Sequence, residues 1–340
     1  MKKHLIAAAV AAAVSGPVAA QVTISGTFDT NVGSVDTGAT TAKASTFSSG
    51  TDGLATSTIV FRGNEDLGGG LKAGFVLSNY FTTNTGVDQA VAASAAVVPN
   101  ELSFDQSYVT LAGDFGQIAA GRIASNASEA WGLGRFAGNF GRLASANANV
   151  ARETSNSIAY TSPTVQGVTV ELFKGNETNG STDGTTAFAI RYVNGPLAIG
   201  AGSGQLETSS TEKRKLTSFA AQYDFGMVRI GALQIAYDPT LASGTDKVTT
   251  RQFHAAAPVA KGITLHVMAG TTKLDDGSEA TNSTHRGFGA TYDLSKRTTA
   301  YAMMLSNDNS SGANYAIRNT TAGGNGADPK STLVGIRHTF

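Results

Sequence analysis

The sequence contains no cysteine, so neither a disulfide framework nor a thiolate metal site can form. It also lacks a charge imbalance, because its 340 residues include 25 basic and 25 acidic side chains. A nucleic-acid-binding chain would carry a basic excess, so we expect no nucleic-acid partner. Prolines number only seven, whereas glycines number 40, and this composition suits many strands joined by tight turns.

Long apolar runs are missing too. The longest, residues 5–14, is too short to cross a bilayer as a helix, and no later stretch approaches about 20 apolar residues. This run follows a basic start and precedes a helix break and the small residues Val18-Ala19-Ala20, a pattern typical of a secretory signal peptide. We predict that residues 1–20 are the signal peptide and that residues 21–340 form the exported protein.

In the last ten residues, apolar and polar side chains alternate strictly. Val334, Ile336, His338 and Phe340 would share one face of a strand, and Leu333, Gly335, Arg337 and Thr339 the other. Similar alternation near the start of the predicted mature chain separates Val22, Ile24 and Phe28 from Thr23, Ser25, Thr27 and Asp29. Closing strands of transmembrane barrels commonly place an aromatic side chain at the lipid–water interface.

Period-2 alternation divides the whole chain into about sixteen segments of 8 to 12 residues. Their joints alternate between two kinds. Short, turn-rich joints occupy residues 67–70, 113–116, 163–167, 194–196, 224–226, 258–262 and 293–296, and long polar joints lie near 35–54, 84–101, 125–153, 176–184, 207–214, 239–247, 273–283 and 307–329. We therefore predict an all-β fold, a 16-stranded antiparallel transmembrane β-barrel with short periplasmic turns, long external loops and a wet lumen. A secreted β-sandwich or β-solenoid would also show alternating strands, but not this regular order of joints.

Five motifs in the predicted order carry a family resemblance. They are residues 61–73 (FRGNEDLGGGLKA), 113–116 with Gly121-Arg122, 156–158 with 160–163, 292–298 and the closing residues 335–340. The chain resembles the trimeric general-diffusion porins of Gram-negative outer membranes, especially the β-proteobacterial group, over essentially its whole predicted mature length. The resemblance implies a homotrimer in the outer membrane, in contact with lipid and lipopolysaccharide, that passes ions and small hydrophilic solutes. It implies no cofactor and no enzymatic activity.

In that family the third long loop folds into the barrel and narrows it, with acidic side chains facing a ladder of arginines. Here that loop would span about residues 124–152. Arg62, Arg122 and Arg152 match family positions at the constriction. Alternation places Arg62 inward, but it groups Arg122 with Ile118 and Ala120, so a bulge would be needed to turn Arg122 toward the lumen.

The acidic side of the constriction departs from the family pattern. Where many relatives have Pro-Glu-Phe-Gly-Gly, this chain has Gly-Arg-Phe-Ala-Gly, so Arg135 replaces a glutamate. Arg142 follows, and Glu129 is the only acid between residues 124 and 151. The predicted constriction is therefore basic, and because a narrow passage focuses the field of its lining residues, we expect the pore to prefer anions. Its predicted members are Arg62, Arg122, Arg135, Arg142, Arg152 and Glu129.

Three other functions remain open on the sequence alone. A channel selective for one anion or sugar would need stacked arginines or a ladder of aromatic side chains, for which Tyr80, Tyr108 and Phe136 are candidates. A surface adhesin or receptor would act through its long loops. A membrane hydrolase would need a histidine beside its nucleophile. His254, His266, His285 and His338 fall on separate predicted strands without metal-ligand spacing, so we predict neither a catalytic nor a metal site.

Overall fold

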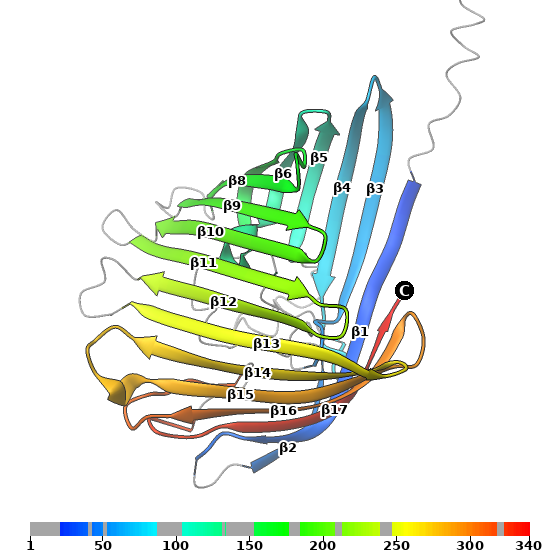
Figure 1. Ribbon diagram of the computed structural model, residues 1–340. Coiled ribbons are helices and arrows are strands. Elements are labelled where there is room, and N and C mark those ends of the chain that lie inside the picture. Colours follow the sequence, from blue (N-terminus) through cyan, green and yellow to red (C-terminus); the bar gives the residue numbers. More distant parts are fainter. Residues whose placement is uncertain are drawn as a thin grey trace, which may run out of the picture.

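The computed structural model describes residues 21–39, 43–49, 53–86, 104–130, 133, 153–176, 184–207, 213–238, 247–317 and 323–340, and the predicted signal peptide lies outside them. The described chain is almost entirely strand (Figure 1). The elements are β1 (Gln21–Asp36), β2 (Lys43–Ser49), β3 (Thr58–Gly68), β4 (Leu71–Tyr80), β5 (Gln106–Gly113), β6 (Gly116–Ala124), the 3-10 helix η1 (Asn126–Glu129), β7 (Glu153–Thr161), β8 (Val168–Asn176), β9 (Gly184–Asn194), β10 (Leu197–Glu207), β11 (Lys213–Asp224), β12 (Arg229–Asp238), β13 (Val248–Ala260), β14 (Ile263–Leu274), the 3-10 helix η4 (Glu279–Thr281), β15 (Ser283–Asp293), β16 (Thr298–Asn309) and β17 (Lys330–Thr339). Neither helix in these ranges is long and apolar enough to span a membrane.

The strands close into one antiparallel ring. From β3 to β17 each strand pairs with the next, and β17 pairs with β1. The first half of β1 pairs with β3 and its second half pairs with β2, so β2 and β3 occupy the same position in the wall. The seventeen segments therefore fill sixteen wall positions. The predicted 16-stranded antiparallel barrel is confirmed, and so is the alternation of short turns and long loops.

The first long joint differs from its prediction, because β2 lies inside the range 35–54 that we expected to be loop. Its sequence, KASTFSS, is small and polar and gives almost no period-2 signal. On the side of β1 opposite β17, the break between β2 and β3 leaves Asp29 without a strand neighbour. Ser57 fills it, since its Oγ accepts a hydrogen bond from Asp29 N (3.0 Å) and donates one to Asp29 O (3.1 Å), while the Thr83 hydroxyl donates to the same carbonyl (3.2 Å). The backbone thus stays satisfied where the ladder is interrupted.

The two faces of the wall differ as the alternation predicted. Large apolar side chains point outward and are strongly exposed, including Phe253 at 65% and Val109 at 61%. The alternate residues point inward and are mostly small or polar, as in β13, where Gln252 and His254 flank Phe253. This arrangement suits lipid outside and water inside the ring.

The short hairpins use glycine where the backbone must adopt positive φ. Gly226 has a φ of 81°, and its N–H donates to Asp224 Oδ1 at 2.8 Å. Gly195, with a φ of 53°, turns the chain between β9 and β10. Such residues make tight turns without steric cost, so the strands stay in strict register across them.

Candidate functional site: the barrel lumen

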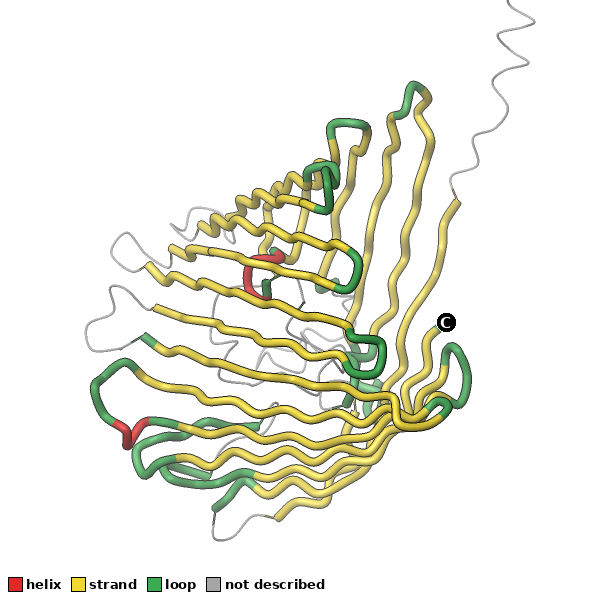
Figure 2. The backbone as a smooth tube through the Cα atoms, in the orientation of Figure 1, coloured by secondary structure: helices red, strands yellow, loops and turns green. Residues whose placement is uncertain are grey.

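The third long loop enters the barrel directly after β6. Ser125 caps η1, and Ala130 ends it in the left-handed conformation with a φ of 47°. Figure 2 shows η1 as the short red segment within the ring of strands, where it contacts the inner faces of β9, β10 and β11. The inward fold that the family resemblance implied is therefore present in the described part of this loop, residues 125–130 and 133.

Two wall side chains bind the backbone of this loop. The Ser218 hydroxyl donates to the carbonyl of Ala127 (2.5 Å) and accepts from the N–H of Ala130 (2.9 Å). The carboxylate of Glu171 accepts from the backbone N–H of Asn126 (2.8 Å) and from its side-chain amide (2.5 Å). These bonds satisfy loop groups that lie away from water, which otherwise would carry a desolvation cost.

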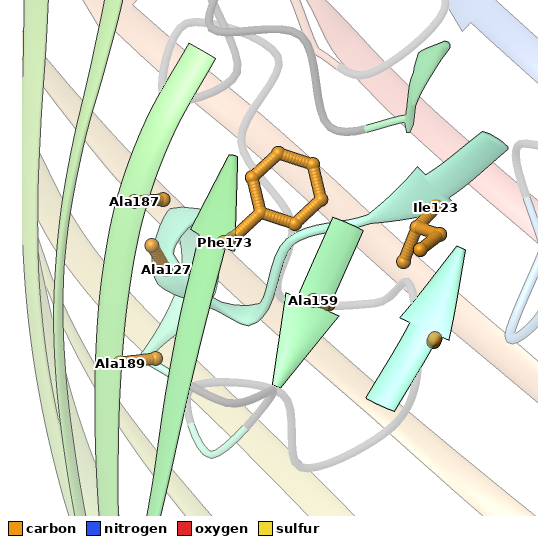
Figure 3. Packing of buried hydrophobic residues seen from close by; sticks show 7 residues of the cluster. Ile123, Ala127, Ala159, Phe173, Ala187 and Ala189 are labelled. Atoms are coloured by element: carbon orange, nitrogen blue, oxygen red, sulfur yellow. The ribbon is translucent and has the colours of Figure 1, made fainter. Parts of the chain in front are cut away.

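Apolar packing adds to these bonds. Ala127 lies in a cluster with Phe173, Ala187 and Ala189 on β8 and β9, seen from close by in Figure 3. Ala130 and Leu133 belong to a second cluster, with Ala198, Leu216, Ala220, Leu233 and Ile235 on β10, β11 and β12. The wall also makes room for the loop backbone at Gly200 and Gly202, where an added methyl group would overlap the carbonyl oxygens of Ala130 and Ala127.

A second segment, Gly53–Ser57, enters the lumen from the opposite side of the ring; we call it the strap. Its Leu54 side chain is 3% exposed and packs among Met268, Tyr301, Met303 and Leu333 on the inner faces of β14, β16 and β17. The N–H of Ala55 donates to Asp29 Oδ2 at 2.9 Å, and the Tyr301 hydroxyl donates to Asp29 Oδ1 at 2.5 Å. The strap and the third loop thus line opposite walls.

The last long loop connects β16 to β17, and its described residues are 310–317 and 323–329. A row of polar side chains binds it to the inner wall. Thr250, Thr272, His285 and Asn307 are joined in series by contacts of 2.9, 2.8 and 2.8 Å across four strands. The amide of Asn307 donates to the carbonyls of Tyr315 (3.2 Å) and Ala316 (3.0 Å). Because the amide nitrogen is used this way, Asn307 Oδ1 must accept from His285, which places a proton on Nδ1 of the histidine.

The predicted constriction residues are only partly described. Arg62 lies on the inner face in one cross-strand row with Val76 and Tyr108, and its side chain is exposed to the lumen. Arg122 pairs with Ser107, and its guanidinium donates to Asp105 O (3.1 Å) and Ser155 Oγ (2.8 Å).

A register shift lies beside Arg122, but the extra residue is on β7. Alternation along β6 is therefore unbroken, and Arg122 stays on the face of Ile118 and Ala120.

Arg135, Arg142 and Arg152 lie outside the described residues, as does Phe136, and for Glu129 only the backbone is described. The constriction as a set stays a prediction.

Four further arginines face the lumen: Arg191, Arg214, Arg229 and Arg337. Alternation in the last strand had already placed Arg337 on the face opposite Val334 and Ile336, whereas the other three were missed from the sequence. Each shares the inner face of its strand with buried neighbours, such as Ala189 beside Arg191 and Leu216 beside Arg214. Strand alternation alone places these arginines on the inner face. The family motifs, by contrast, indicated constriction residues in the third loop.

The four histidines of the described chain lie on separate strands, as the alternation predicted, although His254 and His266 are diagonal neighbours on β13 and β14. His254, His266 and His285 face inward on β13, β14 and β15, whereas His338 faces outward on β17. Within the described ranges, no three His, Cys, Asp or Glu side chains are grouped so that they could hold a metal ion.

A closed ring of sixteen strand positions, apolar outside and polar inside, with loops folded into its lumen, defines a transmembrane diffusion channel. The family model described as Gram-negative porin matches residues 7–313, and the chain belongs to this family. It is accordingly an outer-membrane porin that forms a water-filled channel.

Two relatives match over their full lengths. The chain is 33% identical to outer membrane porin protein 32 of Delftia acidovorans, with 100% of both chains covered, and 26% identical to an outer membrane porin protein of Bordetella pertussis, again over 100% of both. Among solved structures, an anion-selective porin from Comamonas acidovorans has a TM-score of 0.75 at 24% identity, covering 94% of this chain and 100% of that one. The trimer form of OmpT from Vibrio cholerae has a TM-score of 0.69 at 12% identity, covering 95% and 100%.

Proposed function

We propose that this porin passes small hydrophilic solutes passively and prefers anions. The observation that carries the proposal is the set of arginines on the inner face, of which Arg62 lies near the middle of its strand and is exposed to the lumen. Arg191, Arg214, Arg229 and Arg337 extend the positive lining toward both rims. The description of the Comamonas structure as anion-selective supports the same conclusion.

The third loop, about residues 124–152, would form the narrowest part of this pore. Arg135, Arg142 and Arg152 would add to Arg62 there, with Glu129 as the opposing acid. Arg122 would not contribute, because it lies on the outer face of β6 with Ile118, where its guanidinium donates to Asp105 and Ser155. A narrow, low-dielectric passage strengthens the effect of such charges on passing ions. A passive channel of this kind uses no cofactor and no catalytic group.

The reversal potential across a planar bilayer in a potassium chloride gradient tests this proposal. One unit charge at about 4 Å is worth about 1 kcal/mol in bulk water, or about fivefold in local anion concentration. Arg62→Ala should therefore lower the local anion concentration by up to about fivefold at low salt, and the anion-to-cation permeability ratio should fall with it. Arg251→Ala, which removes an arginine from the outer face, should leave the ratio unchanged. Cation selectivity of the unmodified protein would refute the proposal.

Salt provides a second check on the same proposal. The Debye length falls from about 10 Å at 0.1 M to about 3 Å at 1 M. The anion preference should therefore fade over this range, because the fixed charges no longer reach the centre of the lumen. A preference that persists unchanged at 1 M would point to size or contact selectivity instead.

The outer face suggests where the subunits of a homotrimer would meet and where lipopolysaccharide would lie. Outward-facing cations stand within a few residues of the long-loop ends of the strands: Lys174, Lys215, Arg251, Lys273, Arg286 and Lys330. They run from β8 to β17 and suit the phosphate groups of an outer-leaflet glycolipid. In the described parts of β4 to β7 the outer face has no lysine and presents Val109, Leu111, Ile118 and Ile158, all exposed. The one basic side chain on this described part of the outer face, Arg122, donates to Asp105 and Ser155.

We therefore propose that β4 to β7 face a neighbouring subunit and that the strands from β8 to β17 face lipid. Leu111→Lys would place a charge in the proposed subunit contact and should convert the trimer to monomers on a semi-native gel. The matched change on the lipid side, Phe253→Lys, should leave the oligomer intact. The reverse result would move the contact to the other side of the ring.

A further inference from the structure

The strap and the start of the third loop each cover an acidic side chain of the barrel wall. Near the middle of the described strands, two acidic side chains face the lumen, Asp29 on β1 and Glu171 on β8. The other inward acids of the described strands, Asp66, Asp224 and Asp293, lie at the hairpin ends. Each of the two mid-strand acids is covered by a loop segment, with Asp29 at 0% exposure and Glu171 at 4%.

Both carboxylates have their oxygens occupied by donors. Asp29 accepts from the Ala55 N–H at one oxygen and from the Tyr301 hydroxyl at the other, and the backbone of Leu54 also donates to it. Glu171 accepts from the backbone of Asn126 at one oxygen and from its side chain at the other, and the Ser125 hydroxyl also donates to it. A cation needs a carboxylate oxygen at contact distance to bind it, and here the loop segments hold those positions.

The packing around Asp29 holds the strap against its carboxylate. An added methyl group at Gly53 would overlap both Asp29 and Tyr301, so the strap can approach the carboxylate only because residue 53 is glycine. Leu54 fills a pocket formed by Met268, Tyr301 and Met303 and holds the strap in place. Arg62, by contrast, remains exposed to the lumen, and the other four inward arginines are half-buried.

From this contrast we infer that the strap and the start of the third loop act as covers for acids, and that they make the pore anion-selective partly by denying cations the carboxylates of Asp29 and Glu171. Leu54, Ala55, Tyr301 and Asn126 are then positioning residues for selectivity. This inference rests on the proposed anion preference, but the covering itself can be measured without reference to ion flow. Releasing the strap would uncover Asp29 and enlarge the lumen at the same time.

The covering is tested by carbodiimide coupling of a small amine to accessible carboxylates in the folded protein, followed by peptide mass spectrometry. Asp29 and Glu171 should stay unmodified, whereas the exposed loop residue Glu279 should react. In Leu54→Ser, which removes the apolar anchor of the strap, Asp29 should become reactive. Leu294→Ser, the same change at an exposed turn position, should not alter this pattern. Modification of Asp29 in the unmodified fold would overturn the inference.

Ion selectivity supplies the second arm of the test. Leu54→Ser should shift the reversal potential toward cations as the local anion concentration falls by up to about fivefold, because one more unit charge then reaches the lumen. Adding Asp29→Asn to Leu54→Ser should restore the original ratio while the raised conductance remains. Asp29→Asn alone should leave the ratio almost unchanged.

Each remaining outcome has a defined meaning. A large gain in anion preference from Asp29→Asn alone would show that the covered acid already acts on ions, which refutes covering. An uncovered Asp29 with an unchanged ratio would also overturn the inference. If Leu54→Ser does not fold, Tyr301→Phe tests the same point by removing one tether to Asp29. A cation-selective unmodified protein with Asp29 still unreactive would refute the proposed function while leaving the covering intact.

Discussion

Removal of the Ser218 hydroxyl should release the third loop from the wall. In Ser218→Ala the carbonyl of Ala127, a residue with 2% exposure, loses its partner, whereas the N–H of Ala130 keeps its bond to the carbonyl of Asn126. An unsatisfied buried polar group costs about 1–3 kcal/mol, so the docked loop should be destabilised by about that amount. The barrel does not depend on these bonds, so the cost should appear as local detachment of the loop.

Hydrogen exchange measures this detachment directly. Every 1.4 kcal/mol is a factor of ten, so about 1 kcal/mol predicts that the amides of residues 127–130 exchange at least about fivefold faster. Low-frequency noise in the single-channel current should rise in parallel, since the loop would move within the lumen. The control is Thr217→Ala, which removes the neighbouring hydroxyl from the outward face of β11. Unchanged exchange in Ser218→Ala would show that packing alone holds the loop and would refute the reasoning.

Three further predictions concern the other contacts. Gly202→Val should displace the loop from β10, because the added side chain overlaps Ala127, and single-channel conductance should change while the strand content seen by circular dichroism does not. Asn307→Leu should release the last loop, since its bonds to two loop carbonyls are lost, and limited proteolysis should then cut within residues 310–317 of the folded protein. Deleting Phe340 removes two backbone hydrogen bonds with Gly26, and should lower the temperature at which the folded band disappears on a gel.

Much of the wall could be predicted because a barrel strand repeats every two residues and its hairpins need particular turn residues. Phe253 between Gln252 and His254 shows how directly that period reports the two faces. The same rule failed for β2, whose small polar residues alternate too weakly. Sequence and family motifs together indicated an inward third loop and an inward Arg62.

The contacts that hold the loops could not be predicted in the same way. Ser218 and Ala127 are 91 positions apart, and Asp29 and Tyr301 are 272 apart, so no local pattern links them. Their pairing depends on which strands the closed ring brings opposite the loops, and on glycines such as Gly53 that permit close approach. The sequence predicted some of the arginines that face the lumen, such as Arg62. It could not predict that the carboxylates of Asp29 and Glu171 are covered by loop segments.

The seam between β1 and β17 has a consequence for how this chain folds. Gly26 and Phe340 exchange two backbone hydrogen bonds at 3.1 Å, although they lie nearly a full chain length apart, and the Phe340 ring lies 5.8 Å from that of Phe28. Loop closure over such a separation is slow, so the seam should form last. Until then both edge strands offer unpaired N–H and C=O groups to any other strand, which makes the unclosed sheet the species most open to aggregation. An aromatic pair at the seam should help to hold the two edges together once they meet.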